Sequence, residues 1–205
     1  MENIVDIAIN EIIQKYNPDT IILYGSRARG DFKDTSDIDI ACFGENLTTE
    51  KDAGLFNGVY LDLWIYPTSA MTSVSPNDLR FSDGVLVLDK DGKGSAYLKS
   101  VSEYLAKGPE KLNPSDITHT KEWIRKMLGR VQNLDIESNY RKIWLQFELL
   151  EIYFQLKGLW FLGDKKSFQY LQQHDPRAYS LFQNVYANPE NSGHMAALAS
   201  YIITL

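Results

Sequence analysis

The sequence has few of the residues that build disulfides and histidine-based metal sites. It contains one cysteine, Cys42, and three histidines in 205 residues. A single cysteine excludes an internal disulfide and fits a reducing, cytoplasmic environment, and the histidines lack the spacing of metal ligands. No apolar run approaches the roughly 18 residues of a membrane-spanning helix, and the N-terminus has neither a basic region nor a small-residue cleavage site. We therefore expect a cytoplasmic protein with no signal peptide and no membrane partner.

Positive charge is also scarce where a nucleic-acid-binding protein would need it. The net charge is −6, and of the 21 Lys and Arg residues only 10 lie in residues 1–109, against 17 Asp and Glu. Residues 110–205 hold 11 basic and 10 acidic residues. A basic face provides most of the affinity of proteins for nucleic-acid backbones. We therefore expect no long nucleic-acid partner, and the acidic N-terminal half leaves room for a small, cationic one.

Hydrophobic periodicity divides the chain into two parts. Residues 4–16 have a helical period, and short apolar runs bounded by Gly or Pro predict strands at 20–24, 36–43, 59–66 and 84–88, before a helix at 95–106. Beyond Gly108–Pro109 the period is helical, with helices expected at about 114–133, 138–157, 165–173, 176–187 and 191–203. The pattern predicts an α/β (α+β) domain over residues 1–108 and an all-α helical bundle over 109–205.

The most informative segment joins a Gly-Ser turn to two aspartates. Gly25 and Ser26 follow the first predicted strand, and Asp37 and Asp39 lie in the second. Glycine lets the backbone approach a phosphate, and a serine at a helix start offers a hydroxyl among N–H groups that attract anions. Because side chains alternate along a strand, Asp37 and Asp39 are expected to share one face. This order indicates a phosphate-binding turn beside a carboxylate pair.

Carboxylates this close favour a divalent cation, because like charges otherwise raise each other's pKa. Mg²⁺ prefers carboxylate and phosphate oxygens, and Asp62, in the third predicted strand, supplies a further ligand. Three carboxylates can hold two Mg²⁺ ions, one on a triphosphate and one that lowers the pKa of an attacking hydroxyl. A structural role at a strand edge is the alternative for Asp62. Among the nearby polar residues, Arg29 and Ser36 are expected to bind the nucleotide, whereas Arg27 is interpreted as surface charge.

These residues resemble the signature of the DNA polymerase β-like nucleotidyltransferase superfamily: Gly25-Ser26, Asp37-x-Asp39 and the later strand residue Asp62. The resemblance covers roughly residues 4–90. It implies a small mixed sheet flanked by helices, two Mg²⁺ ions, and in-line attack on a nucleoside triphosphate that expels pyrophosphate. It does not settle the acceptor, because the superfamily modifies antibiotics, proteins and nucleic acids.

The layout is similar to that of the kanamycin-type and lincosamide-type nucleotidyltransferases, whose helical domain contributes a glutamate base and a phosphate-binding lysine. Here Glu148 and Glu151 form a narrow acidic stripe on a largely apolar helix. They are candidates for the base or for binding a cationic acceptor, with a solvated stripe as the alternative. Lys165 and Lys166 follow Asp164, which is expected to cap their helix, and oppose its dipole unless an anion is bound. Ordinary surface lysines remain the alternative.

Together the patterns predict an enzyme that transfers a nucleoside monophosphate, in the leading case AMP from ATP, to a hydroxyl of a small-molecule acceptor such as an aminoglycoside or lincosamide antibiotic. One alternative is a protein adenylyltransferase of the antitoxin type, acting on a polypeptide partner. Another, weaker alternative is a nucleotide-binding module without chemistry. The sequence leaves open whether the protein forms a homodimer.

Overall fold

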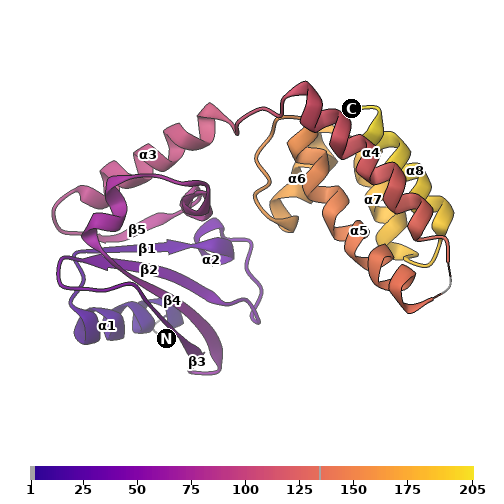
Figure 1. The fold of residues 1–205 in the computed structure, drawn as a ribbon. Helices are drawn as coiled ribbons and strands as arrows, with labels where there is room; N and C mark the ends of the chain where they lie inside the picture. The colour runs from indigo at the N-terminus through magenta and orange to yellow at the C-terminus, as the bar shows by residue number, and fades with distance from the viewer. Residues whose placement is uncertain (1–2, 134) are drawn as a thin grey trace. The chain divides into compact units, whose positions relative to one another are not determined.

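The computed structural model describes residues 3–133 and 135–205, and the chain divides into two compact units. Unit 1, Met1–Lys107, combines a sheet with helices, and unit 2, Gly108–Leu205, is helical (Figure 1). This division falls one residue before the predicted one at 108. The predicted fold class, a mixed α/β part followed by a helical part, is confirmed.

One mixed sheet forms the centre of unit 1. Its strands are β1 (Thr20–Tyr24), β2 (Ile38–Gly44), β3 (Glu50–Phe56), β4 (Val59–Pro67) and β5 (Val85–Asp89), in the order β3-β4-β2-β1-β5. Strands β2 and β4 run parallel, and the other neighbouring pairs are antiparallel. The four predicted strands are present with ends shifted by at most two residues. Strand β3 was missed, because this edge strand lacks an apolar alternation.

Helices cover the two faces of this sheet (Figure 1). Helix α1 (Ile4–Tyr16) begins at Asn3, whose side chain accepts a hydrogen bond from the Val5 N–H, and packs its buried face on one side of the sheet. That side carries the apolar residues Ile38, Ile40 and Leu63. The other side lies toward α3 (Lys93–Lys107) and the short helices η1 (Thr68–Thr72) and η2 (Pro76–Phe81). Alternation along β2 turns Asp39 to this second face.

The described part of unit 2 consists of helices packed on one apolar core. They are α4 (Pro114–Arg130), α5 (Ile136–Leu156), α6 (Asp164–His174), α7 (Pro176–Ala187) and α8 (Ser192–Ile203). Asn113, Asp135, Asp175 and Asn191 cap four of them by accepting hydrogen bonds from first-turn N–H groups. Helix α4 ends three residues before its predicted end. Across the described residues, no helix combines the length and apolar character needed to span a membrane.

Candidate active site

Two of the predicted carboxylates are neighbours on the sheet. Asp39 in β2 and Asp62 in β4 are register partners in the parallel pair, so both side chains project from the same face. Both residues are half-buried. Tyr24 is the β1 partner of Asp39 and lies close enough for the charges of both aspartates to affect its pKa. Burial raises the pKa of Tyr24, Arg80 opposes this, and the charges of Asp39 and Asp62 raise the pKa further.

The Gly-Ser turn brings backbone directly against Asp39. Helix α2 (Gly25–Arg29) starts immediately after β1, and Gly25 has a φ of 71°. A Cβ atom at Gly25 would lie 2.1 Å from Asp39 Oδ2 and 2.9 Å from its Cγ. Any other residue would therefore have to displace the carboxylate. Ser26 follows in the same turn and is half-buried.

Arg27 holds the loop that connects α2 to β2. Its Nη2 and Nε donate to the Ser36 carbonyl at 2.8 and 3.2 Å, and Nε also donates to the Asp37 carbonyl at 3.0 Å. The interpretation of Arg27 as surface charge was wrong, because the returning loop presents backbone acceptors to it. Ser36 also accepts a hydrogen bond from the Lys33 N–H at Oγ, 2.9 Å. Arg29 forms ion pairs with Asp31 at 3.2 Å and with Asp83 at 3.4 Å.

Asp37 lies just outside the strand. Strand β2 begins at Ile38, two residues later than predicted, and Asp37 is exposed. Asp37 therefore lies outside the strand in which alternation was expected to place it on one face with Asp39. In the residues that the structure describes, no group of three or more His, Cys, Asp and Glu side chains is arranged to hold a metal. The role of Asp37 as a metal ligand stays a prediction.

Sequence reasoning missed two cations on this face. Lys51 Nζ lies 2.9 Å from Asp62 Oδ1, and this contact raises the pKa of Lys51. The Arg80 guanidinium lies 4.7 Å from the ring centre of Phe81 and 5.4 Å from that of Trp64. No local pattern could reveal either one, because Lys51 belongs to the unpredicted edge strand and Arg80 to η2.

The carboxylate pair fits a Mg²⁺ ion. Asp62 Oδ1 is buried and accepts no well-aligned hydrogen bond, although Lys51 is near, and the Asp39 carboxylate occupies the place that a Cβ atom at Gly25 would take. Proteins commonly bind Mg²⁺ through one or two carboxylates, with substrate phosphates and water completing the octahedron. Asp39 and Asp62 thus supply the number of protein ligands that such a site requires.

Residues 8–64 match the model of the family described as polymerase beta, nucleotidyltransferase. This match lies within unit 1. The matched residues include Gly25, Asp39 and Asp62. Among solved structures, the nucleotidyltransferase-like protein from Exiguobacterium sibiricum is similar over 97% of this chain and 73% of its own, with 12% identity and a TM-score of 0.45. The comparison with curated proteins gave no match.

In unit 2, the predicted acidic stripe lies on α5. Glu148 accepts a hydrogen bond from Trp144 Nε1 at 2.9 Å, and Glu151 accepts one from Gln155 Nε2 at 3.1 Å. Arg141, a potential partner of Glu148, instead pairs with Glu137 at 2.8 Å. Glu148 is half-buried and Glu151 is exposed. Their predicted roles as base or acceptor ligand stay predictions.

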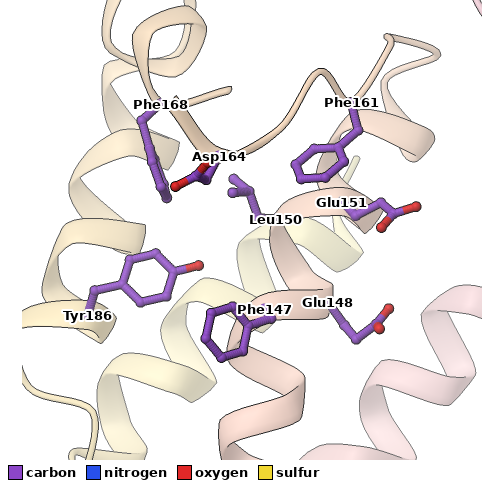
Figure 2. Close-up of a pocket in the computed structure, with 8 residues that line it drawn as sticks. All are labelled: Phe147, Glu148, Leu150, Glu151, Phe161, Asp164, Phe168 and Tyr186. Carbon is purple, nitrogen blue, oxygen red and sulfur yellow. The ribbon is translucent and has the colours of Figure 1, made fainter. Parts of the chain in front are cut away.

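The same helix forms one wall of a pocket within unit 2, of about 360 Å³ (Figure 2). Glu148 and Glu151 lie on one side of it, and Phe168 and Tyr186 lie on the other. The complete lining is Phe147, Glu148, Leu150, Glu151, Phe161, Asp164, Phe168 and Tyr186. Burial, and then the charge of Asp164, raise the pKa of Tyr186 to about 12. The rings and the Asp164 carboxylate suit an organic cation, and the Glu148 and Glu151 carboxylates point outward from the rim (Figure 2).

The start of α6 differs from its prediction. Gly163 is the N-cap residue and Asp164 is the first helical residue, so Asp164 does not cap the helix. A carboxylate in the first turn still interacts favourably with the helix dipole. Lys165 is exposed and Lys166 is half-buried in that turn. Their binding of phosphate stays a prediction.

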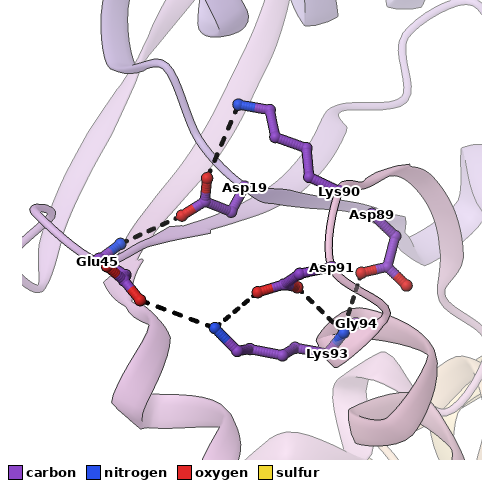
Figure 3. A network of polar contacts seen from close by, with 7 residues as sticks. All are labelled: Asp19, Glu45, Asp89, Lys90, Asp91, Lys93 and Gly94. Carbon is purple, nitrogen blue, oxygen red and sulfur yellow. Dashed lines mark hydrogen bonds and ion pairs between the residues drawn. The ribbon is translucent and has the colours of Figure 1, made fainter.

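A second acidic cluster in unit 1 has a structural explanation. Asp19, Glu45 and Asp91 lie near Lys90 and Lys93, at the opposite end of β1 and β2 from Asp39 (Figure 3). Asp89 beside them accepts hydrogen bonds from the N–H groups of Gly94 and Ser95 at 2.9 Å. Lysines neutralise this cluster, and Asp89 fixes the first turn of α3. It therefore differs from the Asp39–Asp62 pair, in which Asp39 lies against Gly25.

Proposed function

We propose that this protein is a Mg²⁺-dependent nucleotidyltransferase that moves AMP from ATP to a hydroxyl of a small-molecule acceptor. The acceptor oxygen attacks the α-phosphorus and forms a new O–P bond, while the bond to the bridging oxygen breaks and pyrophosphate leaves. The hydroxyl proton passes to a basic group or to water. The observation that carries this proposal is the Asp39–Asp62 register pair, with the Gly25 backbone packed against Asp39.

Each residue of the pair has a defined part in the proposed reaction. Asp39 and Asp62 would hold Mg²⁺, and Asp37 is proposed as a further ligand. Bound Mg²⁺ supplies charge neutralisation for the triphosphate and lowers the pKa of the attacking hydroxyl. Gly25 keeps the backbone close without covering the carboxylate. Lys51 and Arg80 provide positive charge on the same face, suited to an anionic substrate.

The acceptor is proposed to be a cationic small molecule, with an aminoglycoside or lincosamide antibiotic as the concrete case. The pocket of unit 2 supports this class, because it has ligand size and is lined by carboxylates and aromatic rings. No Lys or Arg is among the described residues that line it. An anionic acceptor would be repelled by Glu148, Glu151 and Asp164. Antibiotic resistance would be the corresponding biological role.

The transfer is tested with the full chain, Mg²⁺ and each α-labelled nucleoside triphosphate, together with a pool of aminoglycosides and lincosamides. We expect label on a small molecule, and Asp39→Asn and Asp62→Asn should each lower the rate roughly a hundredfold or more. Glu11→Gln is the matched control, because Glu11 is an exposed carboxylate on α1. Label only on a polypeptide would replace the small-molecule acceptor by a protein. No transfer from any nucleotide, with lysate included as acceptor source, would refute the proposed activity.

The acceptor class is tested separately by kinetics of Glu148→Gln and Glu151→Gln. If these glutamates bind a cation, KM for the acceptor should rise several-fold with little change in kcat. If one of them is the base, kcat should fall by roughly a hundredfold or more and should depend on pH. Glu122→Gln, an exposed carboxylate on α4 outside the pocket lining, is the control. Unchanged kinetics in both variants would mean that Glu148 and Glu151 neither bind the acceptor nor act as the base.

A further inference from the structure

Helix α5 exposes a continuous apolar stripe along its first half. The exposed fractions are 85% for Ile136, 72% for Tyr140, 57% for Ile143, 42% for Trp144 and 70% for Phe147. Spacings of four, three and four residues place Ile136, Tyr140, Ile143 and Phe147 on one helical face, with Trp144 at its edge. We call these five residues the α5 stripe. The opposite face of the same helix is buried in the core of unit 2.

The α5 stripe is larger than an isolated protein surface usually tolerates. If each side chain offers on the order of 200 Å², the exposed fractions amount to roughly 650 Å² of apolar side chain. The largest patch on a typical monomer is about 300–600 Å². A standard protein–protein interface buries roughly 800 Å² from each partner, so the stripe alone would supply most of one side. Its size therefore matches a stable dimer interface.

The order of residues in the stripe makes it complementary to itself. When two α5 helices pack antiparallel about a twofold axis between Arg141 and Lys142, Ile136 faces Phe147 and Tyr140 faces Ile143. Each aliphatic side chain then meets an aromatic one, as an isologous contact requires. The charges beside the stripe do not oppose this pairing, because Arg141 pairs with Glu137 and Lys142 with Glu190 in the same chain.

We propose that a second copy of this chain covers the α5 stripe, forming a twofold-symmetric dimer through antiparallel α5 helices. This inference concerns assembly and does not rest on the proposed function, although Phe147 belongs both to the stripe and to the lining of the unit 2 pocket. A monomeric protein with transferase activity would contradict only the dimer, and a dimer without transferase activity would contradict only the proposed function.

The first test is sedimentation equilibrium of the full chain. The wild-type protein should be dimeric, and Ile143→Glu should raise the dimer dissociation constant roughly a hundredfold or more, because each dimer would bury two unpaired carboxylates. Leu55→Glu is the matched control, since Leu55 is an 81% exposed apolar residue of β3 in unit 1, and it should leave the constant unchanged. Circular dichroism checks that each variant folds. Tyr140→Glu, at a more exposed position, replaces Ile143→Glu if that variant does not fold.

The second test determines the orientation and register in which the two α5 helices pair. Tyr140→Glu and Ile143→Lys should each be mainly monomeric, whereas an equimolar mixture should form heterodimers in which the introduced glutamate of one chain faces the introduced lysine of the other. Parallel helices would place each position against itself and would give no such recovery. A monomeric wild-type protein, or a dimer as tight in Ile143→Glu as in wild type, would overturn the proposal. So would equal weakening by Leu55→Glu. A dimer that Ile143→Glu dissociates but that the mixture does not restore would overturn the antiparallel register.

Discussion

The close approach of Gly25 to Asp39 predicts that Gly25→Ala is unusually destabilising. Two costs combine at this position. An alanine at a φ of 71° would occupy the left-handed region, which costs about 1–2 kcal/mol. Its Cβ would also lie 2.1 Å from Asp39 Oδ2, and overpacking of this kind costs about 1–3 kcal/mol. The free energy of unfolding of unit 1 should therefore fall by roughly 2–5 kcal/mol.

Alanine substitutions at two other glycines distinguish the cost of the left-handed backbone from the cost of overpacking. Gly92 has a φ of 76°, and a Cβ atom there would have no neighbouring atom within 4 Å, so Gly92→Ala should show the backbone cost alone. Gly54 has open space and no left-handed φ, so Gly54→Ala should be neutral or slightly stabilising. Calorimetry measures each Tm, with a shift of about 4–8 °C per kcal/mol for a domain of this size. Hydrogen exchange of β1 and β2 assigns the change to unit 1.

A double variant tests the contact itself. In Gly25→Ala/Asp39→Ala most of the clashing carboxylate is removed, so the overpacking part of the cost should disappear and the two substitutions should not add. The backbone cost should remain, comparable with that of Gly92→Ala. If Gly25→Ala is no more destabilising than Gly92→Ala, or if its effect simply adds to that of Asp39→Ala, the packing of Gly25 on Asp39 is wrong. The proposed metal site would then lose its main geometric support.

Three further predictions concern charge and loop structure. Burial alone would raise the pKa of Asp175, but hydrogen bonds from the Ala178 N–H and the Tyr153 and Tyr201 hydroxyls outweigh it and hold the pKa below its ordinary value. The stabilisation of unit 2 by ionised Asp175 should therefore be complete above the unfolded-state pKa of about 4. It should be lost as the pH falls through the lower folded-state pKa. Urea titrations across pH measure this dependence, and Asp175→Asn should abolish it. Lys51→Met should tighten Mg²⁺ binding in calorimetry by roughly two- to fivefold, because a competing partner of Asp62 is removed, and weaker binding would contradict this. Arg27→Gln should speed proteolysis within residues 30–37, and an unchanged rate would mean that the contacts to Ser36 and Asp37 do not hold the loop.

The part of unit 1 that could be predicted from sequence depends on short-range patterns. Strands β1, β2 and β4 are apolar runs bounded by Gly, Pro or polar residues, so their existence follows from local composition. Asp39 and Asp62 lie within such runs, which is why both could be placed on strands, whereas their shared face depends on the pairing of β2 with β4. Asp37 lies one residue before β2, and strand ends are the least predictable feature of a sequence-based assignment.

The remaining features depend on contacts between distant segments. Lys51 reaches Asp62 only because β3 pairs with β4, and β3 has no apolar alternation that would reveal it. Arg80 lies in η2, and its stacking on Trp64 and Phe81 depends on tertiary packing. Arg27 binds carbonyl groups that the loop brings back from residues 36 and 37. Charged residues whose partners lie far away in sequence leave no local signal.

Lys51 places a positive charge of the chain itself beside the Asp39–Asp62 pair. In this structure the Lys51 ammonium lies 2.9 Å from Asp62 Oδ1. The chain thus supplies positive charge from its own edge strand. Because Lys51 is partly exposed and its side chain is flexible, it can move away at a small cost when a divalent ion binds. This exchange would let Mg²⁺ replace Lys51 at Asp62 in the proposed reaction.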